Sequence, residues 1–305
     1  MKPTIYIERA LYDEPMALVQ QHFTVVDSLQ EAEGYIVPMG KIDEALLAAN
    51  PKLKVVSNIA VGYDGFDLEA MHKHGVVGTH TPHVLDATVA DLTVALVLAV
   101  ARKIPQMDEW VRQGQWQGAV APAHFGVDIH GKKLGIVGLG RIGEQIVKRL
   151  HNGFDMDVYY YNRSRHQELE ETYDATYLSL NELFATCDVV LTMVPLTAET
   201  TGMIGREQLD LLQAHAIFVN TARGLVVDEA ALVQALQNKQ FFGAGLDVFA
   251  QEPIGADHPL CQLDNVVLTP HIGSATEATR KAMQLQAVRN TIAVLKQQGE
   301  AYIVK

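Results

Sequence analysis

A glycine-rich turn between a predicted strand and a predicted helix constrains the fold of this chain most strongly. Residues 133–137 (KLGIV) form a short apolar run typical of a buried strand, and the signature GLGRIG follows at once at 138–143. Apolar residues then recur at helical spacing as far as His151, before Asn152 and Gly153. This order is typical of a dinucleotide-binding domain, although a purely structural strand-to-helix turn can share it.

Each glycine of the signature has a predicted task. Gly138 permits the tight bend, Gly140 lets the backbone approach a pyrophosphate, and Gly143 lets the helix pack closely on the strand. The helix N-terminus then faces the phosphates.

The end of the next predicted strand, 156–161, indicates which nicotinamide nucleotide is bound. An acidic residue at this place would grip the ribose hydroxyls of NAD, but Asn162, Arg163, Ser164 and Arg165 stand here instead. No carboxylate repels a 2′-phosphate, and two guanidinium groups are available to pair with one. We therefore expect NADP(H) to be preferred and NAD(H) to be possible, with a solvated basic turn as the alternative.

Length and charge exclude several classes of protein. The 305 residues suit two domains, and the net charge of −12 opposes binding to nucleic acid or to an anionic membrane. The two cysteines are too few for a disulfide framework, and the most apolar run, 92–101, is about half the length that spans a bilayer. We see no signal peptide and expect a cytoplasmic protein with no metal site.

Two sets of strand-like runs alternate with helical stretches. The first set lies between Thr4 and Gly78 and the second between Lys133 and Thr269, which predicts an α/β chain with parallel, doubly wound sheets. Capping-box spacings predict helix starts at Thr88 with Asp91 and at Ser274 with Glu277. The first of these helices runs to Arg102 and is apolar nearly all round, so we expect it to be covered on several sides and to favour a homodimer.

Arg223, Glu252 and His271 lie downstream of the glycine turn, near the ends of later predicted strands. Reduction of a carbonyl by hydride needs a cation for an acidic substrate, an acid for the new alkoxide, and a partner for that acid. Taken singly, each residue is more often a solvated charge or a loop residue. Together, at the strand ends where doubly wound sheets bind ligands, they predict a dehydrogenase.

The chain resembles the D-isomer-specific 2-hydroxyacid dehydrogenases over essentially its whole length. The matching segments are VGYDGFD at 61–67, ATVAD at 87–91, GIVGLGRIG at 135–143, PLTAET at 195–200, NTARGLVVDE at 220–229, GLDVFAQEP at 245–253 and TPHIGSAT at 269–276. Within the family, the NRSRH turn and the HIGSAT segment look most like the bacterial glyoxylate/hydroxypyruvate reductases, also described as 2-ketogluconate reductases.

The resemblance implies a Rossmann NAD(P)-binding domain and a flavodoxin-like substrate domain with an active-site cleft between them. We expect the substrate domain at residues 1–98, completed by the C-terminal helix 276–305, and the dinucleotide-binding domain at 99–275.

It also implies roles for individual residues. His271 would exchange a proton with the substrate oxygen, Glu252 would orient it, and Arg223 with the amides of Val61 and Gly62 would hold the substrate carboxylate. The implied cofactor contacts, beyond the three glycines, are Thr88, Arg141, Ile142, Asn162, Arg163, Ser164, Arg165, Pro195, Thr200, Thr221 and Asp247.

The predicted activity is NADPH-dependent reduction of small 2-oxo acids, glyoxylate and hydroxypyruvate first and 2-ketogluconate as a further candidate, to D-2-hydroxy acids. The alternatives are an NAD-linked D-lactate or phosphoglycerate-type dehydrogenase and, from another class, a nicotinamide-sensing interaction protein like the corepressors that share this fold. The sequence leaves the roles of His80, His83 and His124 open.

Overall fold

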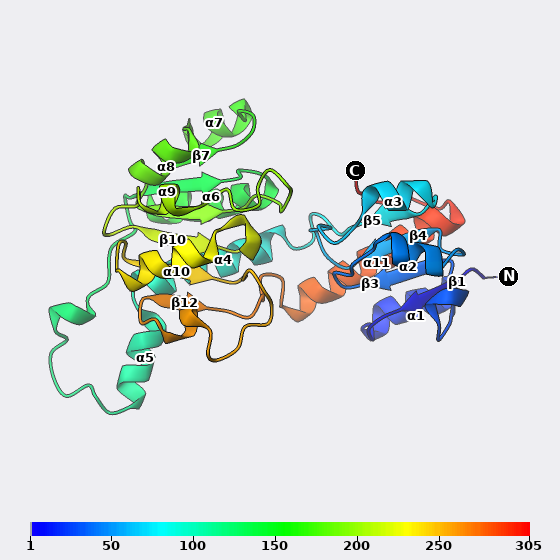
Figure 1. Cartoon of the computed structure of the whole chain (residues 1–305), viewed down its shortest axis with the longest axis horizontal. Coiled ribbons are helices and arrows are strands. Elements are labelled where there is room, and N and C mark those ends of the chain that lie inside the picture. The colour runs from blue at the N-terminus through cyan, green and yellow to red at the C-terminus, as the bar shows by residue number, and fades with distance from the viewer. Residues whose placement is uncertain (1) are drawn as a thin grey trace. The chain divides into compact units, whose positions relative to one another are not determined.

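The structure is a computed structural model that describes residues 2–305, and the chain divides into two compact units (Figure 1). The first unit holds the residues up to Leu85 together with Ser274–Lys305, and the second holds Asp86–Gly273. Each unit is built on its own sheet, so each is described separately.

The first unit is a five-stranded sheet with the strand order β2-β1-β3-β4-β5, in which every neighbouring pair is parallel. This is the flavodoxin-like order. Helix α11 packs against α1, β3 and β4, which returns the end of the chain to this unit. The elements are β1 (Thr4–Ile7), α1 (Asp13–His22), β2 (Thr24–Val25), β3 (Gly34–Val37), α2 (Glu44–Ala49), β4 (Val55–Asn58), α3 (Leu68–Lys73), β5 (Val77–Thr79) and α11 (Glu277–Lys296).

The second unit is a seven-stranded parallel sheet with the order β12-β11-β10-β9-β6-β7-β8. The order reverses between β6 and β9, as it does in a Rossmann sheet, and ligands bind at such a switch point. Its strands are β6 (Lys133–Val137), β7 (Asp157–Tyr161), β8 (Thr176–Tyr177), β9 (Val189–Thr192), β10 (Ile217–Asn220), β11 (Gly243–Leu246) and β12 (Val266–Leu268). Its helices are α4 (Asp86–Ala101), α5 (Ile104–Arg112), α6 (Arg141–Phe154), α7 (Gln167–Tyr173), α8 (Leu180–Thr186), α9 (Arg206–Leu209) and α10 (Glu229–Gln237).

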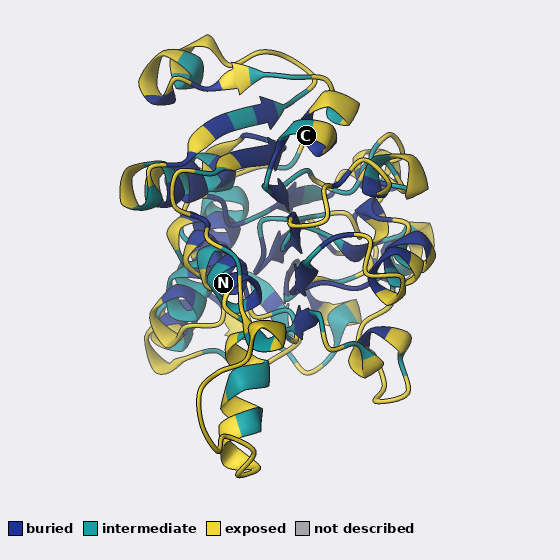
Figure 2. Cartoon of the chain, turned by 90° about the vertical axis from the view of Figure 1, so that its left-hand side faces the viewer, coloured by how far each residue is buried: buried dark blue, intermediate teal, exposed yellow. Residues whose placement is uncertain are grey.

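Two apolar clusters form the core of the second unit. The strands β9 and β10 are buried along their whole length, and β6 is buried from its second residue onward. Figure 2 shows these buried segments in dark blue between helices whose outer faces are exposed. Near-continuous apolar strands are what a parallel sheet covered on both faces requires. The predicted pair of doubly wound parallel sheets is therefore confirmed.

The observed division of the chain differs from the expected one near residue 98. Helix α4 packs against α6, β10 and β11, so residues 86–98 lie in the second unit and not in the first. Its buried side includes Leu96, Val97 and Val100, which belong to a core cluster of that unit. The apolar character of α4 is thus explained mainly by packing within its own unit.

Two of the expected helix starts are wrong. Helix α4 begins at Asp86, so Thr88 and Asp91 both lie inside it and form no capping box. Helix α11 is capped by Thr276, whose side chain accepts the Thr279 N–H, two residues beyond the expected Ser274. Thr276 caps α11 through its hydroxyl alone, since the residue three positions on is Thr279 and not Glu or Gln, so the capping-box spacing selected Ser274 instead.

Among residues 2–305, none of the helices combines the length and the apolar character needed to cross a membrane. The same residues contain no group of three or more His, Cys, Asp or Glu side chains placed to hold a metal ion.

Candidate active site

The three predicted catalytic residues all follow the carboxyl ends of neighbouring strands. Arg223 comes after β10, Glu252 after β11 and His271 after β12, and these strands are adjacent in the sheet. Because parallel strands end at one edge, the sheet gathers the three side chains at the side where doubly wound folds bind ligands.

His271 and Glu252 form a direct pair. The imidazole Nδ1 lies 2.7 Å from Glu252 Oε2. An ionised carboxylate only accepts hydrogen bonds, so the proton of this bond belongs to Nδ1, and Nε2 is left as the atom that can exchange a proton with a ligand. Both side chains are about one-third exposed, at 29% and 33%, which leaves the pair accessible to a substrate.

The Glu252 carboxylate is itself held in place. Its Oε1 accepts the Phe249 N–H at 3.0 Å. Partial burial raises its pKa, but the hydrogen bond from His271, the Phe249 N–H and the charges of His271 and Arg223 outweigh burial, so the pKa of Glu252 lies below its ordinary value. Glu252 therefore stays charged at neutral pH and can accept the hydrogen bond from the imidazole.

Asp247 organises the turn that carries His271. This buried carboxylate, directly after β11, accepts the Thr269 hydroxyl at 2.6 Å, the Ile272 N–H at 2.8 Å and the Gly273 N–H at 2.9 Å. Burial raises the pKa of Asp247, although these three bonds and the charge of His271 act in the opposite direction. The bonds bracket His271 on both sides and fix it at φ +53, a left-handed conformation that costs a non-glycine residue on the order of 1–2 kcal/mol.

Asn220 organises the turn that carries Arg223. It is the buried last residue of β10, and its amide accepts the Ala222 N–H at 3.0 Å and donates to the Arg223 carbonyl at 2.9 Å. The next residue, Gly224, lies so close to the backbone of Phe249 that a Cβ would be 1.9 Å from its carbonyl carbon. Any side chain at Gly224 would push the Arg223 turn away from the segment that leads to Glu252.

The glycine turn has the geometry that the sequence predicts. Gly138 has φ +101, and a Cβ there would lie 2.7 Å from the backbone of Met193 and Val194. A Cβ on Gly140 would meet no atom within 4 Å, so the chain leaves open space beside the turn. Gly143 packs closely against the turn, since a Cβ at this position would lie 3.1 Å from the Gly138 carbonyl oxygen.

Helix α6 starts directly after this turn and has no side-chain cap. Its first-turn N–H groups, including those of Arg141 and Ile142, are the donors that a helix N-terminus offers to an anion. The open space at Gly140 and the uncapped helix start fit a dinucleotide pyrophosphate.

The two arginines after β7 differ in their surroundings. Arg165 is paired through two nitrogens with Glu170 on α7, Nε to Oε1 at 3.0 Å and Nη2 to Oε2 at 2.5 Å. Tyr160 also donates to Glu170, and the hydrogen bonds from Arg165 and Tyr160 lower the pKa of Glu170 to about 2. Arg163 is exposed, and its charge contributes to lowering the pKa of Glu199. Ser164 beside it is exposed as well.

Several other predicted cofactor residues have partners within the second unit. Arg141 Nε lies 3.3 Å from the Asp86 carboxylate, and the Thr221 hydroxyl lies 2.8 Å from that of Thr93. The Thr200 hydroxyl donates to the Pro195 carbonyl at 2.6 Å, which closes the loop after β9. Thr88 lies in the first turn of α4, the helix that packs on α6.

Val61 and Gly62 lie in the first unit, just after β4. Asn58, the last residue of that strand, donates to the Gly62 carbonyl at 2.7 Å, and His80 Nδ1 lies 2.8 Å from the Val61 carbonyl. His80 thus shapes the predicted substrate loop, which answers part of the question that the sequence left open. His83 lies against the Tyr302 ring at 5.6 Å, and the His124 ring lies 4.8 Å from that of Trp110 in the second unit.

Comparison with known proteins identifies the family. Residues 94–273 match the family model described as the D-isomer specific 2-hydroxyacid dehydrogenase, NAD binding domain. The chain therefore belongs to the D-isomer-specific 2-hydroxyacid dehydrogenase family, whose members are NAD(P)-binding oxidoreductases.

Close relatives share almost the full length. Glyoxylate/hydroxypyruvate reductase B of Serratia proteamaculans is 46% identical, over 97% of this chain and 95% of the relative, and that of Escherichia coli is 44% identical, over 97% and 96%. Among solved structures, an NADPH-dependent glyoxylate/hydroxypyruvate reductase from Sinorhizobium meliloti, in complex with NADP and malonate, has a TM-score of 0.89 at 34% identity, covering 100% of this chain and 97% of that one.

The pair formed by Glu170 and Arg165 predicts a pH-dependent contribution to stability. Since the pKa of Glu170 is lowered to about 2 in the folded chain and is about 4.3 unfolded, the contribution is complete above the unfolded value and is lost as pH falls toward the folded one. Glu170→Gln should lower the Tm at neutral pH, and the difference from the wild type should shrink below about pH 4. Thermal unfolding across this range checks it, with Glu168→Gln on the same helix as control. A difference that does not change with pH would mean that Glu170 stabilises through packing alone.

Proposed function

We propose that the chain is an NADPH-dependent reductase of small 2-oxo acids, with glyoxylate and hydroxypyruvate as its first substrates, 2-ketogluconate as a further one, and D-2-hydroxy acids as products where a stereocentre forms. The observation that carries the proposal is the pair between His271 Nδ1 and Glu252 Oε2 at 2.7 Å, which leaves Nε2 as a proton donor at the ligand-binding edge of the sheet. The names of the relatives supply the substrate class.

In this proposal each residue has one task. The Arg223 guanidinium binds the carboxylate and carbonyl of the 2-oxo acid, and the amides of Val61 and Gly62 contribute to carboxylate binding. When bound, the nicotinamide supplies a hydride to the carbonyl carbon. His271 Nε2 gives its proton to the carbonyl oxygen, so that an alcohol forms, and Glu252 holds the imidazole and compensates its charge.

The nucleotide would be held along the same edge. The pyrophosphate would bind at the uncapped start of α6, with Arg141 and Ile142. The adenosine end would lie at the turn of Arg163 and Ser164, which are both exposed. Asp247, one of the cofactor contacts that the resemblance implies, would face the nicotinamide amide, and its bonds to the His271 turn give it a second task. An enzyme that consumes NADPH is expected to work in the cytoplasm, where this reductant is regenerated.

A panel of 2-oxo acids tests the activity. The purified chain should oxidise NADPH with glyoxylate and hydroxypyruvate, measured as the loss of nicotinamide absorbance with each nucleotide. His271→Ala should lose at least about a hundredfold in turnover, the usual range for a general acid, while it still binds NADPH in a fluorescence titration. Preference for NADH with pyruvate or a phosphorylated 2-oxo acid would favour the NAD-linked alternatives. Binding without turnover on any acid would favour a nicotinamide-sensing protein.

Cofactor preference depends on Arg163 more than on Arg165, because Glu170 already engages two nitrogens of Arg165. A charge-assisted bond to a 2′-phosphate is worth about 1.5–3 kcal/mol, so Arg163→Ala should raise the KM for NADPH by roughly ten- to a hundredfold and that for NADH little. Arg165→Ala should have the smaller effect. Equal changes for both nucleotides in Arg163→Ala would contradict a phosphate contact.

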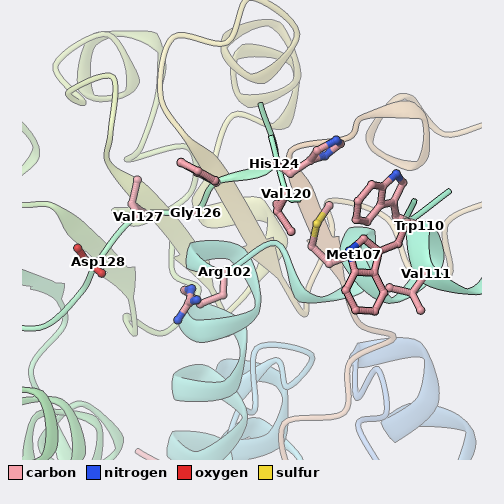
Figure 3. A pocket seen from close by; sticks show the side chains of 11 residues that line it. Arg102, Met107, Trp110, Val111, Val120, His124, Gly126, Val127 and Asp128 are labelled. Atoms are coloured by element: carbon pink, nitrogen blue, oxygen red, sulfur yellow. The ribbon is translucent and has the colours of Figure 1, made fainter. Parts of the chain in front are cut away.

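We also propose a homodimer. The surface that favours it lies on residues 104–125, a segment that begins with α5. Figure 1 shows this segment extending away from the sheet of its unit. It exposes several large apolar side chains, among them Ile104, Val111, Trp116, Val120 and Phe125. Four of these residues, all but Ile104, line a groove with a volume of about 610 Å³ together with Met107, Trp110 and His124 (Figure 3). Exposed aromatic patches of this kind are typical of subunit contacts.

Light scattering at micromolar concentration tests the dimer. The wild type should have twice the mass of one chain, and the double variant Val111→Ser and Trp116→Ser should dissociate at concentrations where the wild type does not. Leu211→Ser, which changes an exposed apolar residue elsewhere in the second unit, is the control and should remain a dimer. A monomeric wild type would rule the proposal out.

A further inference from the structure

Asn162 occupies the position where a Rossmann sheet usually presents the residue that binds the adenosine ribose, the first residue after β7. In this chain its side chain faces the glycine turn. The Leu139 N–H donates to Asn162 Oδ1 at 2.7 Å, and Asn162 Nδ2 donates to the Leu139 carbonyl at 3.0 Å. One amide side chain thus binds both polar groups of a single residue in the turn.

The surroundings hold Asn162 in this arrangement. The Tyr177 hydroxyl donates to the Asn162 carbonyl at 3.1 Å, and the Gly138 N–H donates to the Tyr161 carbonyl at 2.9 Å. The end of β7 and the glycine turn are therefore joined by hydrogen bonds on both sides of Leu139. Leu139 as a whole residue is 1% exposed, so its backbone cannot replace these bonds with water without moving the turn.

We propose that Asn162 is a positioning residue for the glycine turn and does not discriminate between the two nucleotides. The inference rests on the proposed use of nicotinamide nucleotides. Leu139 immediately precedes Gly140 and the start of α6, so the bonds from Asn162 fix the direction in which the first-turn amides of α6 meet a pyrophosphate. The pyrophosphate is common to NADPH and NADH, so Asn162 supports both equally. Discrimination at the 2′-phosphate is left to Arg163.

The inference predicts a specific pattern of nucleotide affinities. Asn162→Ala should weaken NADPH and NADH by the same factor, roughly tenfold for the loss of two neutral hydrogen bonds at a buried peptide. The ratio of their dissociation constants should stay at the wild-type value, and the loss in turnover should fall on the KM for the nucleotide and not on kcat. In contrast, Arg163→Ala should change the ratio.

Asn162→Asp separates this role from contact with the ribose. A carboxylate accepts the Leu139 N–H but cannot donate to the Leu139 carbonyl, so NADH should bind more weakly than it does to the wild type. If Asn162→Asp binds NADH more tightly, the side chain reaches the ribose and the inference is wrong. A selective loss of NADPH in Asn162→Ala would overturn it as well.

Tyr177→Phe serves if Asn162→Ala does not fold, because it removes only the hydroxyl that supports Asn162. The binding of both nucleotides should weaken by one common, smaller factor. A change confined to one nucleotide, or no change at all, would contradict the inference.

Fluorescence titration measures affinity without a substrate. A chain that binds both nucleotides but reduces no 2-oxo acid would therefore contradict the proposed function while the Asn162 pattern is still decided.

Discussion

The candidate active site depends on the buried carboxylate of Asp247. The edge of a parallel sheet consists of irregular turns, and their N–H groups have no strand partner, so each turn needs another source of hydrogen bonds. Asp247 supplies three of them to the segment around His271 and holds that residue in a left-handed conformation. In this arrangement the His271 imidazole lies 2.7 Å from the Glu252 carboxylate.

The same solution recurs along the edges of both sheets. Asn220 holds the turn of Arg223, Asn162 holds the glycine turn, and Asn58 holds the turn of Gly62. Each is the last residue of a strand or the first one after it, and each uses a short polar side chain to imitate a neighbouring peptide. The strands thus fix the conformation of the loops that hold the candidate site residues, and fixed loops of this kind make a preorganised site.

The sequence predicted what local pattern and strand order determine. The strand 133–137 and the glycine turn are predicted from an apolar run and the signature that follows it, because both depend on residues close in sequence. The candidate triplet Arg223, Glu252 and His271 is predicted from its residue types after successive strands and from the family resemblance. The partners of Arg165 and Asn162 were not predicted, since they depend on where α7 and Leu139 lie in the folded chain. The available signal was an Asn or Asp at the end of some strands, namely Asn58, Asn162, Asn220 and Asp247. This signal does not by itself distinguish a ligand contact from a held turn.

A crystal structure of the chain with NADP and a non-reacting 2-oxo acid analogue, such as oxamate, tests the central claim most directly. The account predicts that the carbonyl oxygen of the analogue lies within hydrogen-bonding distance of His271 Nε2, with its carboxylate on Arg223, while Nδ1 remains on Glu252. It also predicts the 2′-phosphate beside Arg163 and an unchanged Asn162–Leu139 contact. An analogue bound away from the carboxyl edge of the seven-stranded sheet, or a His271 that turns Nδ1 away from Glu252, would contradict the account.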